Sequence, residues 1–96
     1  ATVPVGRGVN QVKVSTDGKT LWAALGSEGA VALLDTASLR VVARIPVGQG
    51  PHGIMFTPDD KYAYVTNSDS DDVSVIEIAT QKVIQTIAVG KAPACL

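Results

Sequence analysis

The chain has 96 residues, a net charge of −1 and a single cysteine, Cys95. This length allows at most one small domain with a modest core. The near-neutral charge gives no reason to expect nucleic-acid binding. No apolar run approaches the roughly 18 residues that a membrane-spanning helix needs, and one cysteine cannot form an internal disulfide. Apolar residues make up 46% of the chain but aromatic residues only 4%, and Val, Ile, Ala and Gly favour strands over helices.

An internal repeat of 42 residues organises the whole chain. Val5-Gly6-Arg7-Gly8 recurs as Val47-Gly48-Gln49-Gly50, and the pattern begins again at Val89. At this offset the two units align without a gap. Aligned positions keep the same residue type or the same character: Asp17 with Asp59, Lys19 with Lys61, Trp22 with Tyr64, Val31 with Val73, Ala37 with Ala79, Val41 with Val83 and Ile45 with Ile87. A register kept over two whole units is a strong repeat signal.

Each unit is predicted to contain four short strands: 11–15, 20–25, 30–35 and 40–47 in the first, and 52–57, 62–67, 72–78 and 82–89 in the second. The breaks carry turn chemistry, as in Thr16-Asp17-Gly18-Lys19. Four strands in about 40–45 residues are typical of a β-propeller blade. We therefore expect an all-β fold with two four-stranded antiparallel sheets. The first blade would span 5–46 and the second 47–88, with partial strands of flanking repeats at 1–4 and 89–96.

The second unit resembles the YVTN family of β-propeller repeats. Tyr64-Val65-Thr66-Asn67 is the tetrapeptide that names the family, with Gly50-Pro51-His52-Gly53 and Pro58-Asp59-Asp60-Lys61 before it and Asp72-Val73-Ser74-Val75-Ile76 after it. The first unit keeps the spacing but has Leu21-Trp22-Ala23-Ala24-Leu25 at the tetrapeptide. The resemblance implies the propeller fold and an extracellular, cell-surface or periplasmic location. By the same resemblance, propellers related to this family carry cofactors in respiratory enzymes.

Two blades are fewer than the four to eight that propellers typically have. Strands such as Val31-Ala32-Leu33-Leu34 are apolar on both faces, and such strands are buried on both sides. A pair of blades would leave two apolar outer faces, which mark association. We expect either self-association, as a trimer with six blades or a tetramer with eight, or packing against the remaining blades of a parent propeller. The first unit has five basic and three acidic residues and the second has two and six. This difference would favour a head-to-tail contact, and ordinary scatter of surface charge is the alternative.

The way the chain begins and ends bears on the same choice. Thr2-Val3-Pro4-Val5-Gly6 matches Thr86-Ile87-Ala88-Val89-Gly90, so both ends offer the same outer-strand segment. In a head-to-tail ring the two segments would compete for one place. The redundancy favours a piece of a longer repeat array. A start at Ala1 in place of methionine indicates that the chain was processed or cut from something longer. Pairing of this segment across a subunit boundary is the alternative.

Two groups of residues are candidate metal ligands. His52 enters an inner strand near the expected channel mouth, where a ring of copies would alternate it with Asn10. A circle of imidazoles suits Zn, Cu, Ni or Fe, and turn punctuation is the alternative reading of Pro51-His52-Gly53. Asp69, Asp71 and Asp72 form an acidic turn that could bind Ca²⁺. The calcium-loop spacing is missing, so a solvated turn is the alternative there.

The function expected from these features is a non-enzymatic scaffold or binding segment. No nucleophile has the partner spacing of a catalytic triad, no cofactor is predicted, and Trp22 and Tyr64 are expected to pack between blades. The partner would be a protein or a small ligand at the channel face, and neither nucleic acid nor a membrane span is expected. The alternative function is a fragment of a cofactor- or metal-binding redox propeller that uses His52.

Overall fold

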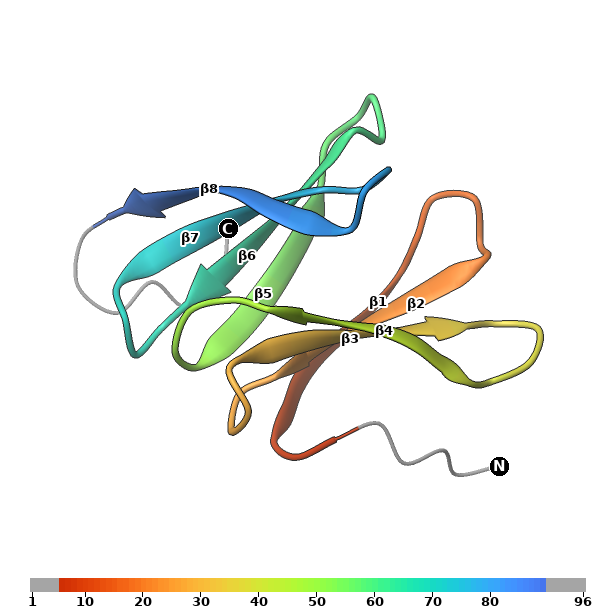
Figure 1. Ribbon diagram of the computed structural model, residues 1–96, viewed down its shortest axis with the longest axis horizontal. Helices are drawn as coiled ribbons and strands as arrows, with labels where there is room; N and C mark the ends of the chain where they lie inside the picture. The colour runs from red at the N-terminus through yellow and green to blue at the C-terminus, as the bar shows by residue number, and fades with distance from the viewer. Residues whose placement is uncertain (1–5, 90–96) are drawn as a thin grey trace.

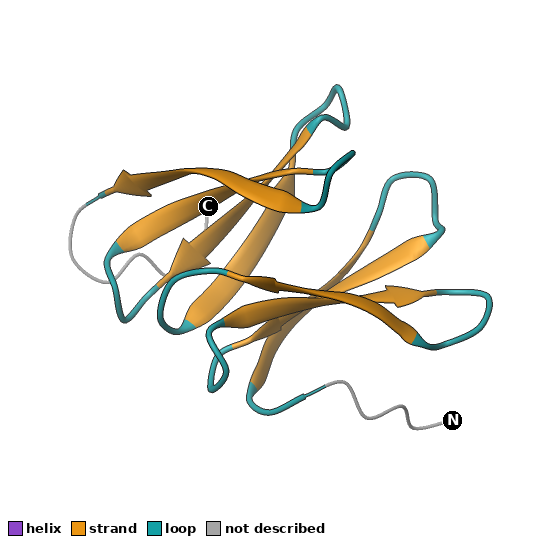
Figure 2. Ribbon diagram, viewed as in Figure 1, coloured by secondary structure: helices purple, strands orange, loops and turns teal. Residues whose placement is uncertain are grey.

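The computed structural model describes residues 6–89, and every regular element in that range is a strand (Figures 1 and 2). The strands are β1 Val9–Val14, β2 Thr20–Leu25, β3 Ala30–Asp35, β4 Val41–Pro46, β5 Pro51–Phe56, β6 Tyr62–Asn67, β7 Asp72–Glu77 and β8 Lys82–Ala88. They form two antiparallel sheets with the strands in chain order, β1-β2-β3-β4 and β5-β6-β7-β8. The predicted all-β fold with two four-stranded sheets is confirmed. We call the sheets blade 1 and blade 2.

Some sequence predictions concern the two ends of the chain, which lie outside residues 6–89. The partial strands expected at 1–4 and 89–96 lie outside the described residues, apart from Val89, and so does Cys95. Residues 6–89 contain no helix that is long and apolar enough to cross a membrane.

The 42-residue repeat is also a repeat of backbone conformation. Within residues 6–89, nine residues have positive φ, and eight of them form four pairs at that offset: Gly8 with Gly50, Gly18 with Asp60, Gly29 with Asp71 and Leu39 with Gln81. Residues with a side chain rarely adopt this conformation. The turns therefore impose the same backbone on both units even where the residue types differ.

The main core lies between the two sheets, and we call this contact the seam. Its buried residues are Trp22, Ala24, Val31, Leu33 and Ile45 from blade 1 and Ile54, Ala63, Val65 and Ile76 from blade 2. Trp22 packs edge-on against Phe56, with the ring centroids 5.3 Å apart and the rings at 79°. β1 contacts β5, and β4 contacts β8. The inner strands of the two blades, β1 and β5, therefore lie together, and so do the outer strands, β4 and β8. Trp22 thus packs between blades as expected.

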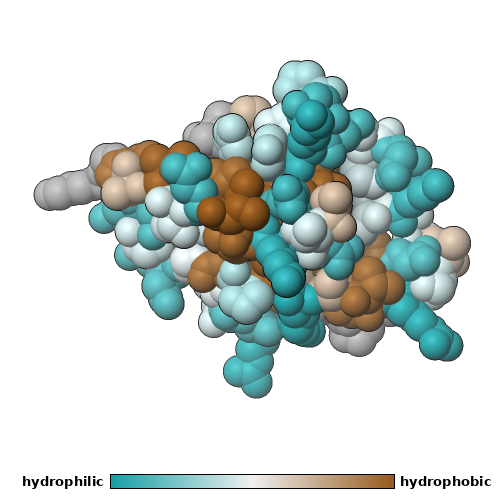
Figure 3. All heavy atoms as spheres, turned by 45° about the horizontal axis from the view of Figure 1, so that its top comes forward, coloured by the Kyte–Doolittle hydropathy of each residue, from teal (hydrophilic) through white to brown (hydrophobic). Residues whose placement is uncertain are grey.

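Each blade also has a face that points away from the seam. Strand register places Val12 and Val14 on the first outer face, and Met55 and Tyr64 on the second outer face. Val12, Val14 and Met55 are 50%, 51% and 41% exposed, and apolar side chains reach the surface in separate groups (Figure 3). The middle strands behave as predicted for two-sided burial, because β2 and β3 each have four consecutive buried residues.

Candidate functional site

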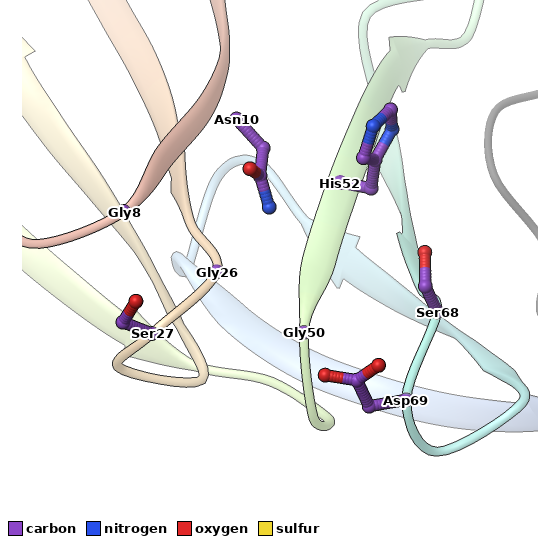
Figure 4. A pocket seen from close by; sticks show the side chains of 8 residues that line it. All are labelled: Gly8, Asn10, Gly26, Ser27, Gly50, His52, Ser68 and Asp69. Carbon is purple, nitrogen blue, oxygen red and sulfur yellow. The ribbon is translucent and has the colours of Figure 1, made fainter.

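A hollow of about 420 Å³ opens at the end of the molecule where β1 and β5 begin (Figure 4). The eight residues that line it form four repeat pairs: Gly8 with Gly50, Asn10 with His52, Gly26 with Ser68 and Ser27 with Asp69. One member of each pair comes from blade 1 and the other from blade 2. Since propeller blades are arranged around a central channel, a hollow built in this way corresponds to a sector of the channel mouth.

Glycines keep the hollow open by letting the start of each inner strand approach the neighbouring turn. Gly50 has a φ of +65°, and a Cβ there would lie 2.5 Å from Asp69 Oδ2. Ser68 N donates to Gly50 O at 3.0 Å, and Gly26 N donates to Gly8 O at 2.7 Å in the first unit. A side chain at Gly50 would strain the backbone and push against the Asp69 carboxylate.

The polar side chains in the hollow differ between the two blades. Asn10 Nδ2 donates to Pro51 O at 2.8 Å, which turns this amide toward blade 2. In Figure 4 the His52 imidazole points away from Asn10, while the Asp69 carboxylate points toward the start of β5. Ser27 adds a hydroxyl. An amide, a hydroxyl, an imidazole and a carboxylate around one hollow can bind a small molecule that both donates and accepts hydrogen bonds.

The structure brings together two residues that the sequence analysis assigned to separate sites. His52 and Asp69 line the same hollow, whereas Asp71 and Asp72 do not. Asp71 occupies the positive-φ turn position that Gly29 holds in blade 1. Within residues 6–89, no group of three or more His, Cys, Asp or Glu side chains is placed to hold a metal ion. Metal binding at these residues stays a prediction.

Asp72 instead belongs to a polar network beneath residues 47–50, which form the connector between β4 and β5. Its Oδ1 accepts hydrogen bonds from Asn67 Nδ2 at 2.8 Å and from Ser70 Oγ at 2.9 Å. Asn67 Nδ2 also donates to Ser74 Oγ at 3.0 Å. Asn67 is fully buried, and its Oδ1 has no partner among the described residues. A Cβ on Gly48 would lie 2.7 Å from Asp72 Oδ1, so the connector passes directly over the network.

This network is not among the predictions from the sequence, although the repeat contains a signal for it. Asn67 and Ser74 stand where the first unit has Leu25 and Ala32, which are apolar and buried. Polar residues at positions that are apolar in the other unit indicate a local hydrogen-bonded cluster.

A smaller cavity of about 150 Å³ lies between the blades at the hairpin turns β1–β2 and β5–β6, with Trp22 and Phe56 among its lining residues. At its rim the Ser15 hydroxyl, and after it the Lys19 backbone N–H, lowers the pKa of Asp17 below the ordinary value of 3.8. Asp59 accepts the corresponding hydrogen bonds in blade 2, which lower its pKa in the same way.

Comparison with solved structures supports the propeller fold. Hydrazine synthase from Kuenenia stuttgartiensis is 30% identical with a TM-score of 0.88 and covers 99% of this chain and 27% of its own. A protein from Bacteroides fragilis whose structure is titled as that of an assigned 6-phosphogluconolactonase is 26% identical with a TM-score of 0.79, over 92% of this chain and 27% of its own. The Cps50 (Swd1) β-propeller domain from Myceliophteria thermophila, at 12% identity and a TM-score of 0.86, covers 99% and 30% and supports the fold alone.

The chain therefore spans between 27% and 30% of the length of these structures. Among curated proteins no sequence matches it. A family model matches residues 2–94, which is nearly the whole chain. By this match the chain belongs to the lactonase family of seven-bladed β-propellers.

Proposed function

We propose that this chain is a two-blade sector of a larger β-propeller and acts as a non-enzymatic binding segment, with the hollow at the channel mouth holding a small polar ligand. The observation that carries the proposal is the pairing of all eight lining residues at the repeat offset. Because each repeat contributes the same four positions, further blades would continue this wall around a channel. The resemblance of the second unit to YVTN repeats remains a prediction, and it agrees with a sector of a larger propeller.

The seven blades of the family favour further blades of one longer chain, over other copies of this chain, as the partners that pack against the two outer faces. Copies of a two-blade chain can build only rings with an even number of blades, whereas the family has seven. The shares of 27% to 30% agree with two blades out of seven. Self-association into a trimer or tetramer is the competing arrangement.

Native mass spectrometry and light scattering across a dilution series separate these two arrangements. We expect no stable trimer or tetramer, because an even-bladed ring departs from the family. A closed trimer or tetramer that persists on dilution would contradict the assignment to a longer propeller.

Ligand binding at the hollow is tested by NMR titration with gluconate, a small molecule with several hydroxyl groups and a carboxylate. We expect shifts at the backbone amides of Asn10 and His52, with weak affinity because only two blades contribute. Asp69→Asn should change these shifts. The matched control is Asp59→Asn, since Asp59 lies at the hairpin turns away from the hollow and should leave the titration unchanged. Absence of any shift at the hollow would contradict binding there by this class of ligand.

Catalysis is a second candidate, because the family is named for lactonases and His52 and Asp69 line one hollow. Either side chain could activate water as a general base. The assay is hydrolysis of glucono-δ-lactone above the spontaneous rate, by the chain and by His52→Ala. Hydrolysis that depends on His52 would replace the binding proposal with an enzymatic one.

The redox alternative is favoured by the likeness to hydrazine synthase at 30% identity. Visible absorbance and metal analysis of the purified protein test this reading directly. A coloured or metal-loaded protein whose signal is lost in His52→Ala would support the redox alternative over the scaffold.

A further inference from the structure

The seam is crossed by polar contacts that run from side chains of blade 1 to the backbone of blade 2. Among the strands within residues 6–89, β5 pairs only with β6, so the backbone groups on its other edge have no strand beside them. Asn10 Nδ2 donates to Pro51 O at 2.8 Å, and Ile54 N donates to Gln11 Oε1 at 2.6 Å. Two neighbouring side chains of β1 therefore satisfy one donor and one acceptor on the open edge of β5.

A third contact joins the blades at the hairpin turns. Thr16 Oγ1 donates to Asp60 Oδ1 at 2.6 Å. Asp60 has a φ of +60° at the position where blade 1 has Gly18, with a φ of +73°. A left-handed conformation is unfavourable for a residue with a side chain, and here it positions a carboxylate against the other blade.

All three donor or acceptor side chains on blade 1 differ from their repeat counterparts. Asn10, Gln11 and Thr16 correspond to His52, Gly53 and Pro58. Glycine has no side chain to accept a hydrogen bond, and proline has no hydroxyl group to donate one. The counterpart of Asp60 is Gly18, which offers no carboxylate. The side-chain contacts of Gln11 and Thr16 therefore have no counterpart on the second outer face.

The partner that Tyr64 would meet also differs. Tyr64 is the counterpart of Trp22, and in the seam Trp22 packs edge-on against Phe56. The first blade of a second copy would present Val14, the counterpart of Phe56, at this place. A head-to-tail contact between copies would thus lose the aromatic pair together with the contacts of Gln11 and Thr16.

We propose that Asn10, Gln11 and Thr16 form a clamp that specifies the joint between blade 1 and blade 2. We propose also that the second outer face accepts a blade other than blade 1 of a second copy. The occupant is a four-stranded blade with an aromatic side chain opposite Tyr64 and polar side chains of its own along the edge. The second outer face carries the same repeat positions that blade 1 packs into the seam, such as Tyr64 at the position of Trp22. This assignment rests on the proposed function only in that further blades complete the ring.

The clamp is tested by giving blade 1 the residues that blade 2 carries: Asn10→His, Gln11→Gly and Thr16→Pro. Blade 2 carries each of these residues at the equivalent position of the repeat, in its inner strand or in the turn that follows. We expect the triple variant to melt roughly 10 °C lower, since each lost hydrogen bond is modest and a small domain responds steeply. Trp22 fluorescence should report the loss, because Trp22 is the one tryptophan of the chain and lies in the seam. The control His52→Asn should leave the midpoint unchanged.

Should the triple variant fail to fold, the single variant Gln11→Ala is measured in the same way, because it removes the side-chain acceptor without the added backbone freedom of glycine. It should melt a few degrees lower. Midpoints equal to wild type in both variants would overturn the clamp.

Partner choice is tested by copying the clamp onto the outer faces with Gly18→Asp, His52→Asn, Gly53→Gln and Pro58→Thr. We expect this variant to associate head to tail at concentrations where the wild type does not, as measured by light scattering. A folded variant that stays monomeric, or a wild type that already forms a closed trimer or tetramer, would overturn the inference. Neither result bears on ligand binding at the hollow, which the gluconate titration measures separately.

Discussion

The seam should carry most of the stability of the two-blade unit, and Ile54→Ala tests this. Ile54 is 4% exposed in the seam, whereas its repeat counterpart Val12 is 50% exposed on the first outer face. The two residues occupy the same position of the inner strand in each blade. Truncating both to alanine therefore compares the seam with an outer face while strand position is held constant.

The magnitudes follow from the atoms removed. Ile54→Ala deletes three buried carbons, worth about 0.8 kcal/mol each, and leaves a cavity that adds to the loss. The expected cost is about 3 kcal/mol of unfolding free energy, or roughly 12–24 °C in melting temperature. Val12→Ala deletes two carbons that are half exposed, so we expect about 0.8 kcal/mol.

The assay is urea unfolding followed by Trp22 fluorescence, with circular dichroism as a second probe. Coincident transitions by the two probes would support two-state analysis, and unchanged slopes would assign the difference to the folded state. Equal costs for Ile54→Ala and Val12→Ala would refute the reasoning, since the outer face would then contribute as much as the seam.

Two further predictions concern charged and polar groups. Because hydrogen bonds lower the folded-state pKa of Asp17 and Asp59 below 3.8, their contribution is present above about pH 4 and is lost as the pH falls through the folded pKa. Urea midpoints should therefore drop as the pH falls below about 4. The double variant Asp17→Asn with Asp59→Asn should flatten that drop, and a curve parallel to that of the wild type would contradict the prediction. Asn67→Leu should cost about 1–3 kcal/mol because it leaves Asp72 and Ser74 short of a partner. Adding Asp72→Ala and Ser74→Ala, which copies blade 1, should restore stability in thermal melts, and a further loss would contradict the account.

The sequence determined the repeat, the strands and the turns, because these depend on local chemistry. The strands predicted at 20–25, 30–35 and 62–67 have the observed bounds, since turn residues bracket them and their apolar runs match strand length. The 42-residue register also predicted which residues of the two blades are equivalent. His52, which was expected where a connector enters an inner strand, lies at the start of β5 and lines the hollow.

Only the tertiary structure decided which residues meet. Asp69, Asp71 and Asp72 are close in sequence, yet only Asp69 lines the hollow, because the turn at Asp71 and the start of β7 direct Asp72 beneath the connector. Gln11 and Ile54 are 43 residues apart and share a hydrogen bond. Contacts of this kind depend on how one sheet packs against the next. A periodic pattern along the chain shows which residues are equivalent, but it does not show which side chains of the neighbouring sheet each residue will contact.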